Sequence, residues 1–469
     1  MPRIARKPAK KNFRRKRPGV KKAVGLPNDA ELAAEEAALG EDVDIEELEA
    51  TGEVVNISEL QKKDIIELNE MAREVGIENF GTMRKQDVIF NILRRHATEG
   101  GVLLADGVLE ILNEGFGFLR SASYNYLHSP EDVYVSPSQI RRFDLQSGDM
   151  ITGRIRPPKE KEKYFALLKV ETVGGEDPDI AKDKTHFDNL TPLFPEERFL
   201  LENDPEEMCT RVVDLICPVG KGTRGIIVAP PRTGKTTILK QICNAITTNH
   251  KEVKVIVMLI DERPKEVTDF ERSVDAEVVA SSNDMDLDTH VRLSRFTIER
   301  CRRMVECGDN VFVLMDSLTR VSRAFNNVSS GSGRTMSGGV DARALEIPRR
   351  MFAAARKIED GGSLTIIATA LIDTGSRMDE LIFQEFKGTG NMELVLERKL
   401  AERRLFPAID IPKSGTRKEE KLFPPEHLDA IFKLRRTMVD LNPIEAMETL
   451  IGALRKHKTN AELLSKLRV

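Results

Sequence analysis

The sequence predicts an α/β protein in which a core of parallel strands and crossover helices follows a small helical unit and a small all-β barrel. In the second half of the chain, apolar runs of strand type alternate with helical stretches. Before them, short alternating runs are separated by glycine, proline, serine and aspartate, as in small barrels. Earlier still, apolar residues recur at helical spacing.

Composition limits the class of protein. The 469 residues, 40% hydrophobic and 32% charged, suffice for two to four domains of about 150 residues. No apolar run reaches ~18 residues, so neither a membrane-spanning helix nor a membrane partner is expected. The five cysteines lack C-x-x-C spacing, which argues against a zinc cluster and predicts a cytoplasmic protein. The formal net charge of −4 gives by itself no reason to expect nucleic acid.

Residues 1–55 combine two blocks of opposite charge. Residues 1–22 contain eleven Lys or Arg and no acid, whereas residues 23–61 contain twelve Asp or Glu and no Lys or Arg. Neither block has enough apolar content to fold alone, so a disordered basic arm and an acidic linker are expected over residues 1–55. The arm either touches nucleic acid non-specifically or is a solvated tail that the acidic block partly neutralises.

Residues 56–101 are predicted to form the helical unit. Ser58 with Gln61 fits a capping box, and apolar residues then recur at helical spacing over residues 60–75. A second helix is expected over residues 85–96.

Residues 102–175 are predicted to form the barrel, and residues 176–200 a connector. A run of alternating glycine and phenylalanine lies inside the barrel. Phe116 and Phe118 are two residues apart, so both rings project from one face of the sheet, together with Arg120. Two exposed rings form a platform on which bases stack, worth ~1–3 kcal/mol per base. The intervening glycines point the other way and leave room for close packing.

Other residues are placed to extend this platform. Tyr134 and Tyr164 supply further rings, and Glu162, on the face of Tyr164, offers a carboxylate to a cytosine amino group. The alternative is that these aromatic side chains fill the core of a small barrel. For the glycine-rich run we favour contact with single-stranded nucleic acid, because the run resembles the RNP1 pattern and stacking needs splayed bases. The choice between RNA and DNA stays open.

Residues 201–425 are predicted to form the α/β core, and residues 426–469 a helical segment. Core strands are expected at Gly225–Val228, Val253–Ile260, Val311–Met315 and Leu364–Ala370. The segment from Ala229 to Thr236 follows the first of them and opens a helix, which is the Walker A arrangement with alanine in place of its first glycine. Lys235 would neutralise the β- and γ-phosphates, and the Thr236 hydroxyl would bind Mg²⁺. The pattern predicts an ATP site with Mg²⁺ as cofactor.

Two predicted strands end in acids. Serving the Mg²⁺ explains a carboxylate at Asp316 better than an unpaired charge does. Glu262 is expected beside the phosphates, where it can polarise an attacking water. A helix-capping or salt-bridge carboxylate is the alternative for Glu262. Two loops rich in glycine and serine, 326–339 and 373–377, either line a pore and grip a phosphate backbone or are ordinary surface loops.

The order of parts resembles the Rho family of bacterial transcription termination factors, hexameric ATP-dependent RNA helicases. The resemblance covers about residues 56–469 and includes ungapped motifs such as Leu364–Gly375 and Phe386–Glu393. It implies a RecA-like P-loop ATPase core preceded by a small helical unit and an OB-fold (cold-shock-like) β-barrel. It also implies an RNA-dependent ATPase and 5′-to-3′ RNA–DNA helicase that binds cytidine-rich nascent RNA, forms a homohexamer and terminates transcription at the RNA polymerase elongation complex.

The resemblance also assigns site residues, position by position. The primary RNA site would comprise Gly115, Phe116, Gly117, Phe118, Leu119, Arg120, Asp132, Val133, Tyr134, Glu162, Lys163 and Tyr164. The ATP contacts would be Gly220, Lys221, Gly222, Thr223, Arg224, Gly225, Arg232, Thr233, Gly234, Lys235, Thr236, Thr237, Arg263 and Phe406, the last against the adenine. The catalytic residues would be Lys235, Thr236, Glu262, Asp316, Arg404 and Arg417, with Thr236 and Asp316 at the Mg²⁺. Arg417 would be an arginine finger that reaches the ATP of the neighbouring subunit. The secondary RNA site would comprise Arg334, Thr335, Met336, Ser337, Gly338, Gly339 and Arg377, in which the two arginines stand where other members often have lysine.

Two other functions share some of these features. A rotary or protein-export ATPase of the F-type class has the same kind of core but does not account for the aromatic barrel. An RNA-binding protein with a regulatory nucleotide sensor needs neither Glu262 nor Arg417.

Overall fold

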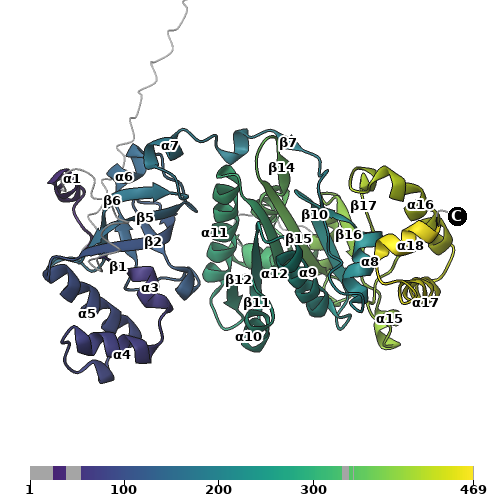
Figure 1. Cartoon of the computed structure of the whole chain (residues 1–469), viewed down its shortest axis with the longest axis horizontal. Helices are drawn as coiled ribbons and strands as arrows, with labels where there is room; N and C mark the ends of the chain where they lie inside the picture. The colour runs from purple at the N-terminus through teal and green to yellow at the C-terminus, as the bar shows by residue number, and fades with distance from the viewer. Residues whose placement is uncertain (1–24, 39–53, 330–336, 342, 468–469) are drawn as a thin grey trace, which may run out of the picture.

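The computed structural model of the chain describes residues 25–38, 54–329, 337–341 and 343–467. Along the long axis in Figure 1, the helical unit and barrel come first, then the α/β core, then the C-terminal helices. The expected disorder of residues 1–55 falls mostly outside the described residues. Where it can be compared it is wrong, because residues 29–38 form helix α1 (Asp29–Ala38). None of the described helices is both long and apolar enough to cross a membrane.

The helical unit consists of β1 (Val54–Asn56), α3 (Ile57–Lys62), α4 (Ile65–Glu74), η1 (Phe80–Thr82) and α5 (Lys85–Thr98). The predicted capping box at Ser58 and Gln61 is wrong. Asn56 caps α3 instead, by accepting a hydrogen bond from the Ser58 backbone, and Asp64 caps α4. Gln61 is buried, and its Nε2 donates to Glu131 Oε2 of the barrel at 2.7 Å. A residue with a local capping pattern therefore serves a contact between two domains.

The barrel is built from β2 (Val102–Ile111), β3 (Gly117–Arg120), β4 (Val133–Val135), β5 (Met150–Arg156) and β6 (Phe165–Val173), with η2 (Ala122–Tyr124) and α6 (Pro137–Arg142) between strands. The strands pair in the order β2-β3-β4-β6-β5, and β5 pairs again with β2, so five strands close on themselves. The inward side chains, Leu109 and Phe165 among them, form one core with Leu68 and Ile89 of the helical unit.

Short elements interrupt the connector. They are α7 (Pro178–Lys182), η3 (Phe187–Asn189), β7 (Pro192–Leu193) and β8 (Arg198–Phe199). β7 pairs with β14 (Arg356–Ile358) and β8 with β9 (Val219–Gly220), so the second half of the connector is fastened to the core.

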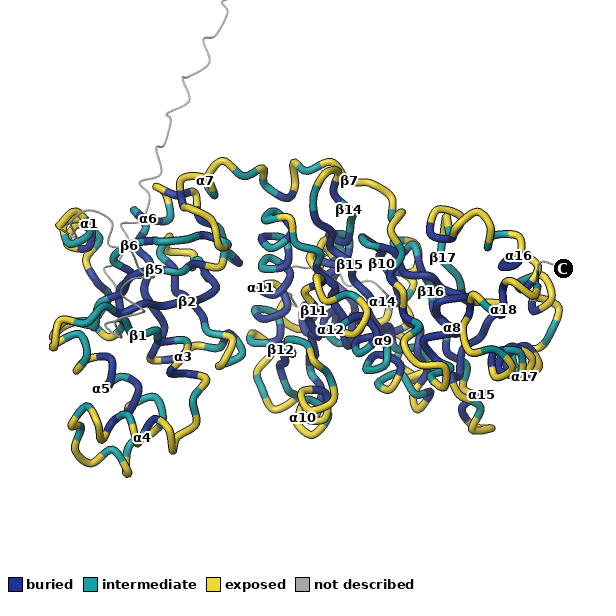
Figure 2. The backbone as a smooth tube through the Cα atoms, in the orientation of Figure 1, coloured by how far each residue is buried: buried dark blue, intermediate teal, exposed yellow. Residues whose placement is uncertain are grey.

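The core is a parallel sheet with the strand order β12 (Glu277–Ser282), β11 (Val253–Glu262), β13 (Asn310–Asp316), β15 (Ser363–Leu371), β10 (Arg224–Ala229) and β16 (Met392–Val395). A short β17 (Gly415–Thr416) adds antiparallel to β16. Four of these strands are the predicted ones, and β12 and β16 were not predicted. These strands are mostly buried, as their dark blue tubes in Figure 2 show. The α/β fold class is therefore confirmed.

Helices cover both faces of this sheet. Ile227 packs toward α8 (Met208–Ile216) and α9 (Lys235–Asn249), and Val228 packs toward α11 (Leu287–Glu306) and α12 (Leu318–Ser329). The remaining described helices of the core are α10 (Pro264–Ser273), η4 (Ser337–Gly339), α13 (Glu346–Ala353), α14 (Arg377–Lys387), α15 (Arg398–Glu402) and η5 (Glu419–Lys421). Because neighbouring strands are parallel, their carboxyl ends meet at one edge, where a ligand site is expected.

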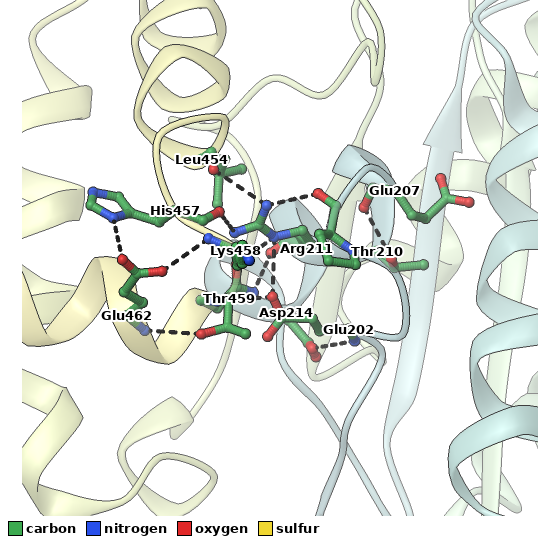
Figure 3. Close-up of polar contacts among 12 residues, drawn as sticks. Glu202, Glu207, Thr210, Arg211, Asp214, Leu454, His457, Lys458, Thr459 and Glu462 are labelled. Atoms are coloured by element: carbon green, nitrogen blue, oxygen red, sulfur yellow. Dashed lines mark hydrogen bonds and ion pairs between the residues drawn. The ribbon is translucent and has the colours of Figure 1, made fainter.

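The C-terminal helices are α16 (Pro425–Val439), α17 (Pro443–Leu454) and α18 (Asn460–Leu467). Figure 3 shows how they are held to α8. The buried Arg211 donates to the carbonyl oxygens of Pro205 (2.9 Å), Leu454 (3.3 Å) and His457 (2.9 Å), and its Nε lies 3.1 Å from Glu202 Oε1. A buried guanidinium with this many acceptors is compensated, so it fixes the helical segment against the core.

The barrel contacts the core through β12 and α11. The Tyr126 ring is buried beneath the guanidinium of Arg300, whose Cζ lies 5.1 Å from the ring centroid, and its hydroxyl donates to Glu277. Arg292 of α11 donates to both carboxylate oxygens of Glu110 at 2.9 Å. The barrel and the core are therefore joined by specific polar contacts.

Candidate nucleotide site and nucleic-acid surface

The loop between β10 and α9 has the geometry of a phosphate-binding loop. Gly234 precedes α9 with φ 86°, and no side chain of the described residues caps this helix, so its first N–H groups are left for an anion. Thr233 Oγ1 donates to the Pro230 carbonyl at 2.8 Å and folds the loop back on itself. Arg232 adopts φ 66°, a strained conformation for a non-glycine residue that clusters at ligand sites. The loop therefore fits a nucleotide phosphate.

Lys235 lies between the acids that end two neighbouring strands. Its Nζ is 2.5 Å from Asp316 Oδ2 and 3.7 Å from Glu262 Oε1. Asp316 also accepts a hydrogen bond from Thr369 Oγ1 at 2.8 Å, and Glu262 is 3.0 Å from Arg320 Nη1. Both carboxylates are buried. The carboxyl ends of β11 and β13 thus bring these acids to the P-loop lysine.

The environment of Glu262 favours its neutral form. Burial and the charge of Asp316 raise the pKa of Glu262, against the lowering effect of Lys235 and Arg320. A carboxylate with a raised pKa is a better proton acceptor, which suits the general-base interpretation. The ion pair with Arg320 equally suits the salt-bridge alternative, so the geometry is compatible with both roles.

Oxygen donors for a magnesium ion are present at the same edge. Thr236 occupies the first turn of α9, next to Lys235, whose Nζ lies 2.5 Å from Asp316 Oδ2. A hydroxyl and a carboxylate beside a phosphate loop are the ligands that Mg²⁺ prefers when phosphates complete its shell. No cluster of three or more His, Cys, Asp or Glu side chains able to hold a metal ion occurs among the described residues.

An exposed ring lies beside the P-loop. Phe406 is 47% exposed, and a Cβ placed on Gly234 would be 3.5 Å from its ring. The ring is therefore positioned to cover a base bound at the loop. Two predicted arginines are exposed. Arg404 is two residues before Phe406 and has φ 59°. Arg263 directly follows Glu262 and lies 3.9 Å from Glu266.

The other predicted ATP contacts lie at the opposite end of the sheet. Residues 220–225 enter β10, whereas the P-loop leaves it, and six strand residues separate the two ends by roughly 20 Å. Gly222 instead packs against the backbone of Lys357, and its N–H donates to Thr365 Oγ1 at 2.8 Å. One nucleotide cannot touch both stretches of the same chain.

Arg417 belongs to this second group. It lines a cavity of about 780 Å³ together with Gly222, Thr223, Arg224, Arg356 and Asn391. Burial and the charges of Arg356 and Arg417 lower the pKa of Arg224. None of the described residues that line this cavity is acidic. The predicted ATP residues therefore divide into a P-loop group and a cationic group.

The rings predicted for the primary RNA site gather on one face of the barrel. The centroid of Phe118 is 4.8 Å from that of Tyr164, 5.8 Å from that of Phe116 and 6.1 Å from that of Tyr134. A Cβ on Gly117 would be 2.6 Å from Leu109 Cδ1, so the glycine allows the close approach of β2 that the sequence predicts.

Two polar residues of this face are already engaged. Arg120 lies over the Phe118 ring and is buried, with Nε 2.8 Å from Glu110 and a further ion pair to Asp132. Glu162 accepts from Arg156 Nη2 at 2.9 Å. Neither the Arg120 guanidinium nor the Glu162 carboxylate is free of partners.

The expectation of exposed rings is wrong for Phe118 and Tyr134, whereas Phe116 and Tyr164 are partly exposed. Phe118 and Tyr134 are only 5% and 4% exposed, because Leu32 of α1 packs on them. Burial and the negative charge of Asp29 raise the pKa of Tyr134 to about 12. The segment expected to be disordered is instead folded onto the predicted platform, as the position of α1 beside β6 and α6 in Figure 1 shows.

The predicted secondary RNA site is described in part. Arg334, Thr335 and Met336 lie outside the described residues, and Ser337 begins η4. Gly338 and Gly339 both have φ 81°, and a Cβ on Gly338 would be 3.3 Å from the Arg377 carbonyl oxygen. The two glycine-rich loops therefore lie side by side, with Arg377 exposed at the start of α14.

Sequence reasoning missed several charged or polar residues at these sites. Arg320 comes four residues after Asp316, near the start of α12, and Thr369 is a polar residue in a largely apolar strand. Both could have been recognised from the local sequence. Arg156 and Lys159 hold the acids of α1, which no local pattern indicates.

Three family models match the chain. They are the N-terminal domain of Rho termination factor over residues 59–101, its RNA-binding domain over residues 105–179, and the nucleotide-binding domain of the ATP synthase alpha/beta family over residues 209–416. Among solved structures, the chain is similar to an ATPase from the type III secretion system of pathogenic bacteria, with a TM-score of 0.50 and 23% identity over 60% of this chain and 88% of that chain. This likeness shows the fold of the ATPase core alone.

Curated relatives extend the similarity to most of the chain. It is 53% identical over 417 residues to transcription termination factor Rho of Pseudomonas aeruginosa, which covers 88% of this chain and 100% of the relative. It is 53% identical over 414 residues to the Rho factor of Bacillus subtilis, covering 88% and 96%, and 51% identical over 418 residues to that of Haemophilus influenzae, covering 88% and 100%. The chain therefore belongs to the Rho family of transcription termination factors.

Proposed function

We propose that the chain works as an RNA-dependent ATPase and 5′-to-3′ RNA–DNA helicase in a homohexameric ring, on cytidine-rich nascent RNA in the cytoplasm. As a member of its family it is an ATP-dependent, RNA-binding transcription terminator. The observation that supports a ring-shaped assembly is that the predicted ATP residues lie at two opposite ends of one sheet. Two adjacent subunits are needed to bring both groups to one nucleotide.

Each P-loop residue has a role in this proposal. The first N–H groups of α9 and the Lys235 ammonium would hold the β- and γ-phosphates. Thr236 and Asp316 would hold Mg²⁺, which when bound offsets the phosphate charge. Glu262 would orient and deprotonate the attacking water while Arg320 fixes its carboxylate, since Arg320 lies 3.0 Å away.

The cationic group would complete the site from the neighbouring subunit. Arg417, supported by Arg224 and Arg356, would meet the γ-phosphate across the interface. An arginine finger in trans adds ~10³–10⁵ in rate and makes hydrolysis depend on ring assembly. RNA held by the loops around Gly338 and Arg377 would close the interfaces, and successive turnovers would move the ring along the transcript toward the RNA polymerase elongation complex.

ATP hydrolysis by the purified full chain tests the proposal. Cytidine-rich single-stranded RNA is expected to stimulate turnover strongly, and matching DNA to stimulate it little. A duplex of RNA and DNA with a 5′ cytidine-rich RNA overhang tests strand separation under the same conditions. Turnover indifferent to nucleic acid would contradict the proposal and favour an export or rotary ATPase. No turnover by assembled rings would favour a nucleotide-sensing RNA-binding protein.

A further inference from the structure

Helix α1 covers the aromatic face with an apolar side chain. Leu32, 1% exposed, packs against Phe118 and Tyr134, and Leu26 joins the same cluster with Phe116 and Tyr164. The sequence predicts that bases of RNA stack on these four rings. An apolar group of α1 therefore occupies the position that a base would take.

The acids of α1 meet the basic residues at the rim of the same face. The helix carries four acids and neither lysine nor arginine. Glu35 Oε2 is 2.7 Å from Arg156 Nε, and Glu35 Oε1 is 2.5 Å from Lys159 Nζ. Glu36 is 2.9 Å from Arg142. Arginine and lysine pair with phosphates in the same way as they pair with these carboxylates.

Arg156 joins helix α1 to Glu162, which is predicted to recognise a cytosine base. Arg156 binds Glu35 through Nε and Glu162 through Nη2, the latter at 2.9 Å. Removing Glu35 frees the Nε–H of Arg156, while Nη1 and Nη2 stay paired with Glu162, the residue predicted to accept a cytosine amino group. Helix α1 and the predicted RNA site therefore share Arg156.

The barrel does not need α1 to complete its own core. Alternate residues of β6, Phe165 and Leu167, point into the main barrel core, which contains no residue of α1. Ala166 and Leu168 point outward, into the separate cluster that Leu32 covers. Among the described residues, α1 is thus an addition to a barrel whose core is filled without it.

We propose that residues 25–38 compete with single-stranded RNA for the aromatic face of the barrel, with Leu32 in the place of a base and Glu35 and Glu36 in the place of phosphates. This inference rests on the proposed function of that face. Undocking of the helix precedes or accompanies RNA binding, so the affinity for a short strand is lowered by the fraction of molecules in which α1 is docked.

Binding of a labelled short oligocytidylate to the full chain tests the competition. Leu32→Ala and Glu35→Gln each remove one kind of contact from the helix and leave the barrel unchanged. Both are expected to tighten binding, and the double variant by about tenfold. Glu70→Gln, which removes an exposed acid of α4, is the matched control and should bind as the unmodified chain does. Equal affinity of all variants would overturn the inference, whereas no binding by any of them would instead contradict the proposed function.

Hydrogen exchange of the backbone of residues 29–38 gives an independent readout. Oligocytidylate is expected to speed exchange in this segment while slowing it in β3 and β4. Saturating RNA that leaves α1 protected would mean that the helix is a fixed part of the barrel, and the inference would fail. Slower exchange in β3 without any change in affinity between variants would have the same meaning.

Discussion

The nucleotide site and the aromatic face of the barrel balance their charges in different ways. At the nucleotide site, Lys235, Asp316 and Glu262 come from the ends of adjacent core elements, so the sheet itself holds them together. On the aromatic face, Arg156 is shared between the nearby Glu162 and Glu35, which lies 121 residues away along the chain. A site built from strand ends keeps its arrangement, whereas a face covered by a distant segment can be opened. Whether the aromatic face is accessible therefore depends on helix α1, which lies far from the barrel strands in sequence.

A polar bridge connects the two regions. Glu110 of β2 lies 2.8 Å from Arg120 on the RNA side and 2.9 Å from Arg292 of α11 on the core side. Arg120 in turn lies over Phe118, one of the rings of the aromatic face, with its Cζ 5.1 Å from the ring centroid. Ion pairs therefore link the aromatic face of the barrel to the core.

The strongest test separates the two ends of the sheet. Arg417→Ala is expected to lower RNA-stimulated ATP turnover by about 10³–10⁵, because it removes the proposed arginine finger. Mixing this variant with Lys235→Ala should restore part of the activity, since mixed interfaces join an intact P-loop to an intact Arg417. Arg436→Ala, at an exposed position of α16, should leave turnover unchanged. Failure to recover activity at every mixing ratio would contradict a site shared between subunits.

The next test asks whether the nucleotide site can be lost alone. Lys235→Ala is expected to lower hydrolysis by about 10²–10³, since it removes a preorganised charge at the phosphates. RNA capture should persist, because the described contacts of Lys235 lie within the core. Lys251→Ala, an exposed residue after α9, is the control. Parallel loss of hydrolysis and RNA capture would show that the regions are not separable.

The corresponding test on the barrel removes the rings. Phe116→Ala combined with Phe118→Ala is expected to weaken RNA binding by about 1–3 kcal/mol for each base that loses its stacking partner. Nucleotide affinity should be unchanged, and a thermal melt checks that the barrel remains folded, since Phe118 is buried. Phe432→Ala, at a partly exposed position of α16, serves as control. Unchanged RNA affinity would return these rings to a structural role.

The smallest expected effect is that the docking of helix α1 on the barrel depends on pH. Although burial opposes it, hydrogen bonds and charge from Lys159 and Arg156 hold the pKa of Glu35 below its ordinary 4.5. A lowered pKa of Glu35 in the docked state means that its contribution to docking is complete above pH 4.5 and is lost as the pH falls through the lowered value. The exposed Glu31, 3.6 Å from Lys159, adds a weaker charge to the same cluster.

Tyrosine emission measures this change. The chain has four tyrosines and no tryptophan, and all four tyrosines lie in the barrel region. Acidification is expected to change the emission of Tyr134 and Tyr164 as α1 leaves them. The change should be reduced in Glu35→Gln, which cannot titrate at this position. An identical transition in that variant would assign it to other carboxyls.

The core and its site could be predicted from local patterns. Asp316 ends an unbroken apolar strand and Lys235 opens a helix after a strand, so their neighbours in sequence already place them at one edge. β12 was not predicted because its residues, Glu-Val-Val-Ala-Ser-Ser, include a glutamate and two serines. Glu277 is accommodated there by Arg300 and Tyr126, which come from a helix and from the barrel. Only the folded arrangement shows why a polar residue lies in this strand.

The aromatic face shows the limit of such patterns. The positions of its rings follow from the alternation of strand residues, and the structure confirms that they cluster. Their burial could not be predicted, because α1 has one large apolar side chain, Leu32, among alanines and acids. A helix with so little amphipathic periodicity depends on its contacts with the barrel rather than on its own pattern.

The separation of the P-loop group from the cationic group has a consequence for counting sites in an assembly. Each subunit would contribute half of one site at each end of its sheet. A row of subunits with free ends would then have one complete site fewer than it has subunits, and closure into a ring would add the missing one. A subunit that lacks either Lys235 or Arg417 would remove one site, whereas a subunit that lacks both would remove two adjacent sites. The turnover of mixed rings would therefore fall more steeply with the dose of the double variant than with that of either single variant.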